Sequence, residues 1–120
     1  MASAAELIRT GVEQLQREVP ALERLKLVVR LELRGRGDVQ VYRVEVPGPK
    51  ISKGEPDDAR LSVSLARSHF NELVAEGKAK HWRDAYEQGH LKVRGNPDVQ
   101  RLIGTVIERQ MARAKLKKVY

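Results

Sequence analysis

The chain has 120 residues, 41% hydrophobic and only 4% aromatic, so it is long enough for one domain with a single core built mainly from Val, Leu and Ile. It contains no cysteine, which excludes disulfides, thiolate nucleophiles and cysteine metal sites. The net charge of +7 raises the question of an anionic partner, such as nucleic acid or a membrane surface. The answer depends on how the charged residues are distributed along the chain.

Two features of the sequence bear on where in the cell the protein is found. No segment has the apolar length of a membrane span. Glu6 and Arg9 interrupt the weak apolar run at the N-terminus, which therefore lacks a signal-peptide core. We expect a single cytoplasmic domain over residues 1–120.

The first predicted element is an amphipathic helix from about Ala4 to Glu18, with Ser3 and Glu6 as a capping box and Pro20 as its stop. Its polar face mixes acidic and basic residues, whereas helices that lie on membranes are usually basic there. We therefore expect this helix to pack on a sheet. Its apolar side consists of Leu7, Ile8, Val12, Leu15 and Val19.

Two strands are predicted next. Apolar and charged residues alternate from Leu25 to Arg34, which indicates a strand with one buried face. A Gly-rich turn leads into a second run, Val39 to Val46, so the two form an antiparallel hairpin. The apolar parity changes inside the second run, and a bulge near Tyr42 would account for it. The Pro-rich segment Pro47 to Asp58 is predicted either as a short edge strand around Ile51 or as a flap.

Three further helices and two strands complete the prediction. A strand over Ala59 to Leu65 is followed by a helix that ends at Gly77, and a second helix ends at Gly89. A strand spans His90 to Arg94, and Asn96 caps the last helix. This order predicts an α+β fold, with an antiparallel-rich mixed sheet of four to five strands and helices packed mainly on one face.

The residues from Ala85 to Gly104, AYEQGHLKVRGNPDVQRLIG, resemble the C-terminal signature of sterol carrier protein type 2 domains, also called non-specific lipid-transfer proteins. Upstream, Ala59 to Lys78 resembles the preceding strand and helix of that family, with Ala66 where the family commonly has a hydroxyl residue. Together these segments cover about half of the chain. The signature is matched, in order, by Gln88, Gly89, Leu91, Lys92, Val93 and Gly95.

The resemblance implies a non-catalytic protein that binds or transfers a hydrophobic lipid, such as a fatty acid, a fatty acyl-CoA or a sterol-like ligand. The ligand would lie in an apolar tunnel between the sheet and the last helix, with no cofactor and no metal. Periodicity alone cannot distinguish this tunnel from a closed core. The expected tunnel walls are Phe70, Leu73, Val74, Trp82, Leu102, Ile103, Val106 and Ile107.

No catalytic machinery is visible in the sequence. His69, His81 and His90 fall in different predicted elements and form no i, i+4 pair, so we interpret them as surface residues. No serine lies in a nucleophile elbow. An enzyme is therefore not expected.

The positive charge is concentrated at the C-terminal end. Met1 to Gly89 holds 15 basic and 14 acidic residues, whereas His90 to Tyr120 holds 8 basic and 2 acidic ones. A solvated helix end is one interpretation, and contact with an anionic membrane surface is another. Nucleic acid is disfavoured because Tyr120 is the only aromatic residue in this segment. The basic helix end consists of Arg109, Arg113, Lys115, Lys117 and Lys118.

Two alternatives to a lipid carrier stay open at this point. In the first alternative, the chain is a basic interaction module with a filled core, and its last helix binds nucleic acid or an acidic partner. In the second, it is an accessory domain that holds a hydrophobic substrate for a separate lipid-metabolising enzyme.

Overall fold

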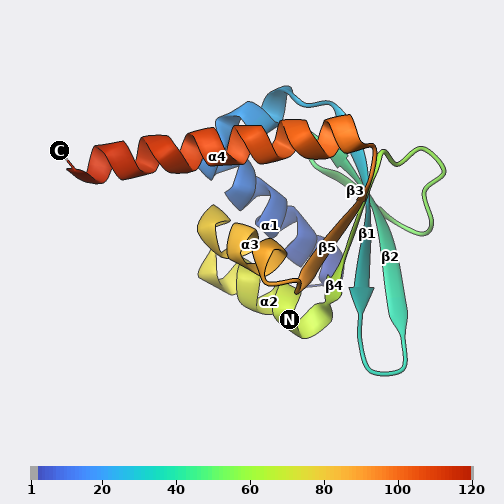
Figure 1. Ribbon diagram of the computed structural model, residues 1–120. Helices are drawn as coiled ribbons and strands as arrows, with labels where there is room; N and C mark the ends of the chain where they lie inside the picture. Colours follow the sequence, from blue (N-terminus) through green and yellow to red (C-terminus); the bar gives the residue numbers. More distant parts are fainter. Residues whose placement is uncertain (1–2, 120) are drawn as a thin grey trace.

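The computed structural model describes residues 3–119, and it describes their side chains as far as residue 113 (Figure 1). The side chains of Lys115, Lys117 and Lys118, part of the predicted basic end, lie outside the described residues. The elements are α1 (Ala4–Glu18), the 3-10 helix η1 (Pro20–Arg24), β1 (Leu27–Arg34), β2 (Val39–Val46), β3 (Lys50–Lys53), β4 (Leu61–Ala66), α2 (Arg67–Glu76), α3 (Ala79–Glu87), β5 (Leu91–Gly95) and α4 (Pro97–Val119).

The five strands form one mixed sheet in the order β3-β2-β1-β4-β5. β1 and β4 are parallel, and the other three neighbouring pairs are antiparallel. Figure 1 shows the helices gathered on one side of this sheet. The predicted α+β architecture, with an antiparallel-rich mixed sheet and helices mainly on one face, is confirmed.

The second strand runs without the predicted bulge. Its pairing with β1 is continuous from Val46 opposite Leu27 to Val39 opposite Arg34. Tyr42 is buried on the same face as Val44, and its hydroxyl lies 3.0 Å from Gln40 Oε1. The bulge prediction was wrong because it counted the outward-facing residues Val39 and Val41 as the buried set, when the inward apolar face of this strand includes the tyrosine.

Two other strand predictions are refined by the structure. β1 begins at Leu27 rather than Leu25, because η1 occupies the preceding residues and the N–H of Leu25 donates to the carbonyl of Leu22. Of the two interpretations of the Pro-rich segment, the edge strand is the one found: Ile51 pairs with Val44 in β3.

The face of the sheet opposite the helices is polar and cross-linked by ion pairs. Ser64 Oγ donates to Glu32 Oε2 at 2.8 Å, and Arg30 Nη2 lies 3.2 Å from the other oxygen of the same carboxylate. The Ser64 hydrogen bond and Arg30 hold the pKa of Glu32 below its usual range. On the neighbouring strand, Arg43 Nη2 lies 2.7 Å from Asp58 Oδ2 and lowers the pKa of that carboxyl.

The core lies between the sheet and helices α1 and α2. Phe70, Leu73 and Val74 of α2 are all buried, and the Phe70 ring meets the Trp82 ring edge-on at 5.8 Å. Gly11 allows α1 to approach α2 closely, because a Cβ at this position would lie 3.2 Å from Val74 Cγ2 of α2. Ile8 of α1 is 1% exposed. Around Leu73 and Val74, this part of the molecule is a packed apolar core.

The last helix is attached differently. Asn96 caps it as predicted, since its Oδ1 accepts from the N–H of Asp98 at 2.9 Å. Gly95 precedes this cap with φ +133°, and a Cβ there would overlap the carbonyl oxygen of Arg60. Between residues 97 and 113, none of the residues of α4 is buried, and the helix packs mainly on β5 and η1. Figure 1 shows its C-terminal end extending past the other helices.

Candidate functional site

An apolar cavity of about 460 Å³ lies between the inner face of the sheet and the helices α1, η1, α3 and α4. Its floor comes from inward-facing residues of β1, β2, β4 and β5, which stand on one face because side chains alternate along a strand. The cavity is partly open to solvent. The floor consists of Leu27, Val29, Leu31, Val44, Val46, Val63, Leu91 and Val93.

The outer wall is one side of α4. Ile103 and Ile107 are four residues apart and face the cavity together, with Gly104 between them. Since no described residue of α4 is buried, these two isoleucines pack against the cavity instead of a filled core. The far wall is closed by Val12 and Leu15 of α1, Leu22 of η1 and Leu25, which directly follows η1.

The structure brings together four of the eight residues expected from the sequence. Phe70, Trp82, Ile103 and Ile107 line the cavity. Leu73 and Val74 are buried in the core beneath it and do not line it. Leu102 and Val106 also do not line it, and Leu102 is 48% exposed.

Sequence reasoning missed the floor of the cavity and the wall formed by η1. The signal for the floor was present, because Leu27, Val29 and Leu31 share the alternation that predicted the strand. A buried strand face can meet either a helix or a void, and alternation is the same in both cases. Leu22 had no periodic signal, since it lies in the short helix η1, whereas Leu25, the residue after η1, belonged to the alternation that predicted the first strand.

Polar groups are few on this cavity wall, and most of them belong to α3 and α4. Arg83 of α3 lies near three carboxylates: Nη2 is 3.7 Å from Asp84 Oδ1, Nε is 3.9 Å from Glu87 Oε1, and Nη1 is 3.9 Å from Glu108 Oε1 of α4. These are ion pairs beyond hydrogen-bond distance. The pair with Glu108 spans the gap between the two helices.

Three nitrogen atoms of the lining residues are buried and have no hydrogen-bond partner within the part of the chain that the structure describes. They are Nε2 of Gln16, Nε1 of Trp82 and Nε of Arg83. Gln16 is 8% exposed and is the one buried polar residue of the described chain. All three atoms are N–H donors, and a buried donor without an acceptor lowers stability.

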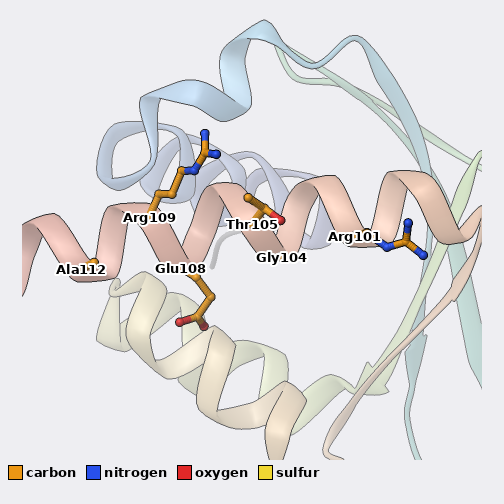
Figure 2. Close-up of a pocket in the computed structure, with 6 residues that line it drawn as sticks. All are labelled: Arg101, Gly104, Thr105, Glu108, Arg109 and Ala112. Atoms are coloured by element: carbon orange, nitrogen blue, oxygen red, sulfur yellow. The ribbon is translucent and has the colours of Figure 1, made fainter.

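An adjacent side of α4 carries a second, shallow hollow, which shares Gly104 and Glu108 with the cavity (Figure 2). It is open to solvent and is lined by Arg101, Gly104, Thr105, Glu108, Arg109 and Ala112. Figure 2 shows Glu108 pointing toward α3, whereas Arg109 points to the side of η1 and Arg101 away from both. Of the charged residues that line this hollow, only Glu108 points toward α3.

The histidines are placed outside the cavity wall. The rings of His69 and His90 stack with their centroids 4.8 Å apart, a pairing that their sequence separation did not indicate, and His81 Nδ1 lies 3.0 Å from Glu76 Oε2. Among the described residues, no group of three or more His, Cys, Asp or Glu side chains is arranged to hold a metal ion. In residues 3–119, no helix has the length and apolar character needed to span a membrane.

Comparisons of sequence leave the chain without a match: no family model and no curated protein matches it. Comparison of structures gives matches to sterol carrier proteins. The palmitated SCP2L2 of Aedes aegypti shares 18% identity at a TM-score of 0.58, covering 83% of this chain and 93% of its own. The apo form of sterol carrier protein 2 from Yarrowia lipolytica shares 22% identity at a TM-score of 0.50, covering 68% and 70%.

A third match is part of a much longer protein. The sec-alkyl sulfatase PisA1 matches at a TM-score of 0.51 with 14% identity, over 72% of this chain but only 14% of the sulfatase. At these identities the matches concern the fold alone. The resemblance inferred from the sequence is confirmed at this level: the chain has the fold of sterol carrier protein 2 domains.

Proposed function

We propose that the protein binds and transfers hydrophobic lipids without changing them chemically, and that the cavity between the sheet and α4 holds the ligand. The ligands that suit such a cavity are a fatty acid, a fatty acyl-CoA or a sterol-like molecule. The observation that carries the proposal is the apolar cavity of about 460 Å³ beneath a helix with no buried residue between positions 97 and 113. The palmitated state of SCP2L2 is further support, at the level of a shared fold.

The energetic cost of leaving this space empty favours a ligand. At roughly 24 cal/mol per Å³, a dry cavity of this size would cost on the order of 11 kcal/mol, which is comparable with the whole stability of a small domain. Each methylene group buried in it contributes about 0.8 kcal/mol. A single long acyl chain therefore gains enough to bind in the micromolar range after its ordering costs.

The attachment of α4 supplies a route for exchange. This helix is held at its start by β5 and the Asn96 cap, while further along it contacts η1 and forms the long Arg83 to Glu108 pair. An exposed pair at this distance contributes little, typically below about 1 kcal/mol. Small outward movements of α4 would open the cavity without disturbing the core around α2.

The experiment compares two neighbouring tryptophan substitutions. Ile103→Trp fills the cavity from α4, and Leu102→Trp places the same side chain on the exposed side of the same helix. We expect Ile103→Trp to weaken displacement of the neutral dye Nile red by palmitate or hexadecanol at least tenfold, and Leu102→Trp to change it less than twofold. Equal binding by both folded variants would mean that the ligand lies elsewhere.

A second candidate function is that of an accessory domain which presents a hydrophobic substrate to an enzyme. It is favoured by the match to a 14% portion of the sulfatase PisA1, where this fold is part of an enzyme chain. The same cavity would serve both functions. Copurification of a lipid-modifying enzyme with the tagged protein, lost in Ile103→Trp, would favour the second.

A further inference from the structure

The polar edge of the cavity has the wrong charge for an anionic ligand. Arg83 supplies one positive charge, and Asp84, Glu87 and Glu108 supply three negative charges within 4 Å of its guanidinium. Glu87 and Glu108 themselves line the cavity. A carboxylate or phosphate headgroup placed here would meet two uncompensated negative charges, whose repulsion is reduced by water because the Glu87 and Glu108 side chains are mostly exposed, but keeps its sign.

Three hydrogen-bond donors of the lining residues have no acceptor among the residues that the structure describes. The three unpartnered atoms of Gln16, Trp82 and Arg83 are all donors, and their residues all line the cavity. A hydroxyl, ester or ketone oxygen accepts a hydrogen bond without bringing a charge. At the α3–α4 edge, such a group can accept a hydrogen bond from the Arg83 guanidinium without adding negative charge, whereas a methyl group accepts none.

We infer that the cavity selects an uncharged amphiphile, one whose head carries hydroxyl or carbonyl oxygens, over an ionised fatty acid of the same length. This inference rests on the proposed lipid-binding function and narrows its ligand class. The head lies between α3 and α4, where Arg83 donates to it, and the hydrocarbon part lies on the sheet floor. A fatty alcohol, a neutral ester and a sterol-like molecule all have this chemistry.

The test compares hexadecanol with palmitate at about pH 8, where the carboxyl group is ionised. Displacement of Nile red gives the affinity of each ligand, and the ratio of the two affinities is the readout. We expect the native protein to favour hexadecanol at least tenfold. Because any apolar site discriminates somewhat against a carboxylate, the decisive comparison is between charge variants.

Glu87→Gln combined with Glu108→Gln removes the two acidic groups that line the cavity while keeping side-chain size. The affinity ratio should shift toward palmitate by about tenfold or more. The matched control, Glu13→Gln combined with Glu72→Gln, makes the same change in net charge at two exposed residues that do not line the cavity. We expect this control to shift the ratio less than twofold.

The role of the donor is tested separately with Arg83→Met, which keeps the length of the side chain and removes its N–H groups. Hexadecanol should bind about fivefold more weakly to this variant, with the fold verified by circular dichroism. Unweakened hexadecanol binding would overturn the assignment of Arg83 as the donor to the head.

The outcomes separate the two proposals. If palmitate binds the native protein as tightly as hexadecanol, or if both double variants shift the ratio equally, the inference about the headgroup is overturned while lipid binding stands. If neither ligand displaces the dye, the proposed function fails and the inference fails with it. A tenfold shift confined to the Glu87 and Glu108 variant supports both.

Discussion

Helices α2 and α4 lie on the same side of one sheet, yet they are packed in opposite ways. α2 buries Phe70, Leu73 and Val74 in a continuous core, each with 6% exposure or less. α4 is more than twice as long, and none of its residues between 97 and 113 is buried. The two helices therefore differ in role: α2 packs into the core and stabilises the fold, whereas α4 covers an apolar cavity.

This difference has a sequence basis. α2 presents a compact apolar cluster of Phe70, Leu73 and Val74, and the helix packs on β4 and β1. α4 places Ile103 and Ile107 toward the cavity but has Gly104 between them and Gln100 and Glu108 along the same side. Burying the polar side chains of Gln100 and Glu108 against an apolar floor would cost free energy, which disfavours closer packing of α4 on the sheet.

The largest expected effect contrasts the two helices directly. Leu73→Ala should lower the free energy of unfolding by about 3 kcal/mol, because it leaves a cavity in a filled core. Ile107→Ala, which removes a side chain that already borders open space, should cost less than about 1 kcal/mol in lipid-free protein. Urea denaturation measures both. Equal losses would mean that α4 is packed as tightly as α2.

The second prediction concerns the junction that holds α4. Gly95→Ala should cost about 2 to 3 kcal/mol, because the residue has φ +133° and its Cβ would overlap the backbone of Arg60. Gly89→Ala is the matched control, since it also has positive φ but no atom within 4 Å of the added Cβ. We expect that control to cost about 1 kcal/mol. Thermal unfolding of the two variants provides the comparison, and a smaller loss for Gly95→Ala would contradict the observed close approach.

The smallest effect on the free energy of unfolding is expected for a substitution on the solvent-facing side of the sheet. The Ser64 hydrogen bond and Arg30 lower the pKa of Glu32 in the folded state, so the ionised carboxyl stabilises the fold above its usual pKa of 4.5. This stabilisation is lost as the pH falls through the lowered folded pKa. Glu32→Gln should therefore cost about 1 kcal/mol near neutral pH, and the difference from the native protein should close as the pH falls below the usual pKa and through the lowered folded pKa.

The measurement for this prediction is urea denaturation of Glu32→Gln at a series of pH values. Glu13→Gln, an exposed residue of α1, is the control and should stay within about 0.5 kcal/mol of the native protein throughout. A Glu32→Gln loss that persists unchanged at low pH would show that the substitution acts by some route other than charge.

Much of the fold was predictable because local signals and tertiary packing agree. α1 spans Ala4–Glu18 as expected, with Ser3 Oγ accepting from the N–H of Glu6 at 3.2 Å. Gly77 ends α2 in the left-handed conformation, and Asn96 caps α4. The prediction failed at β2, where an aromatic residue with a polar tip belongs to the buried face.

The site was predictable only in part. Helical spacing correctly grouped Ile103 with Ile107, but it did not tell which of the adjacent apolar residues of α4, such as Leu102, would point away from the cavity. The approach of Arg83 to Glu108 depends on how far α4 stands from α3, a distance that no local pattern encodes. The volume of a cavity is likewise a property of tertiary packing and not of periodicity.

The central claim is that the space between the sheet and α4 holds a lipid, and native mass spectrometry of protein purified from cells tests it most directly. We expect a mass increment of one lipid per chain, which disappears on delipidation, returns with added hexadecanol and is absent from Ile103→Trp. Folded native protein that carries no lipid and takes up none, under conditions that preserve other lipid complexes, would contradict the account.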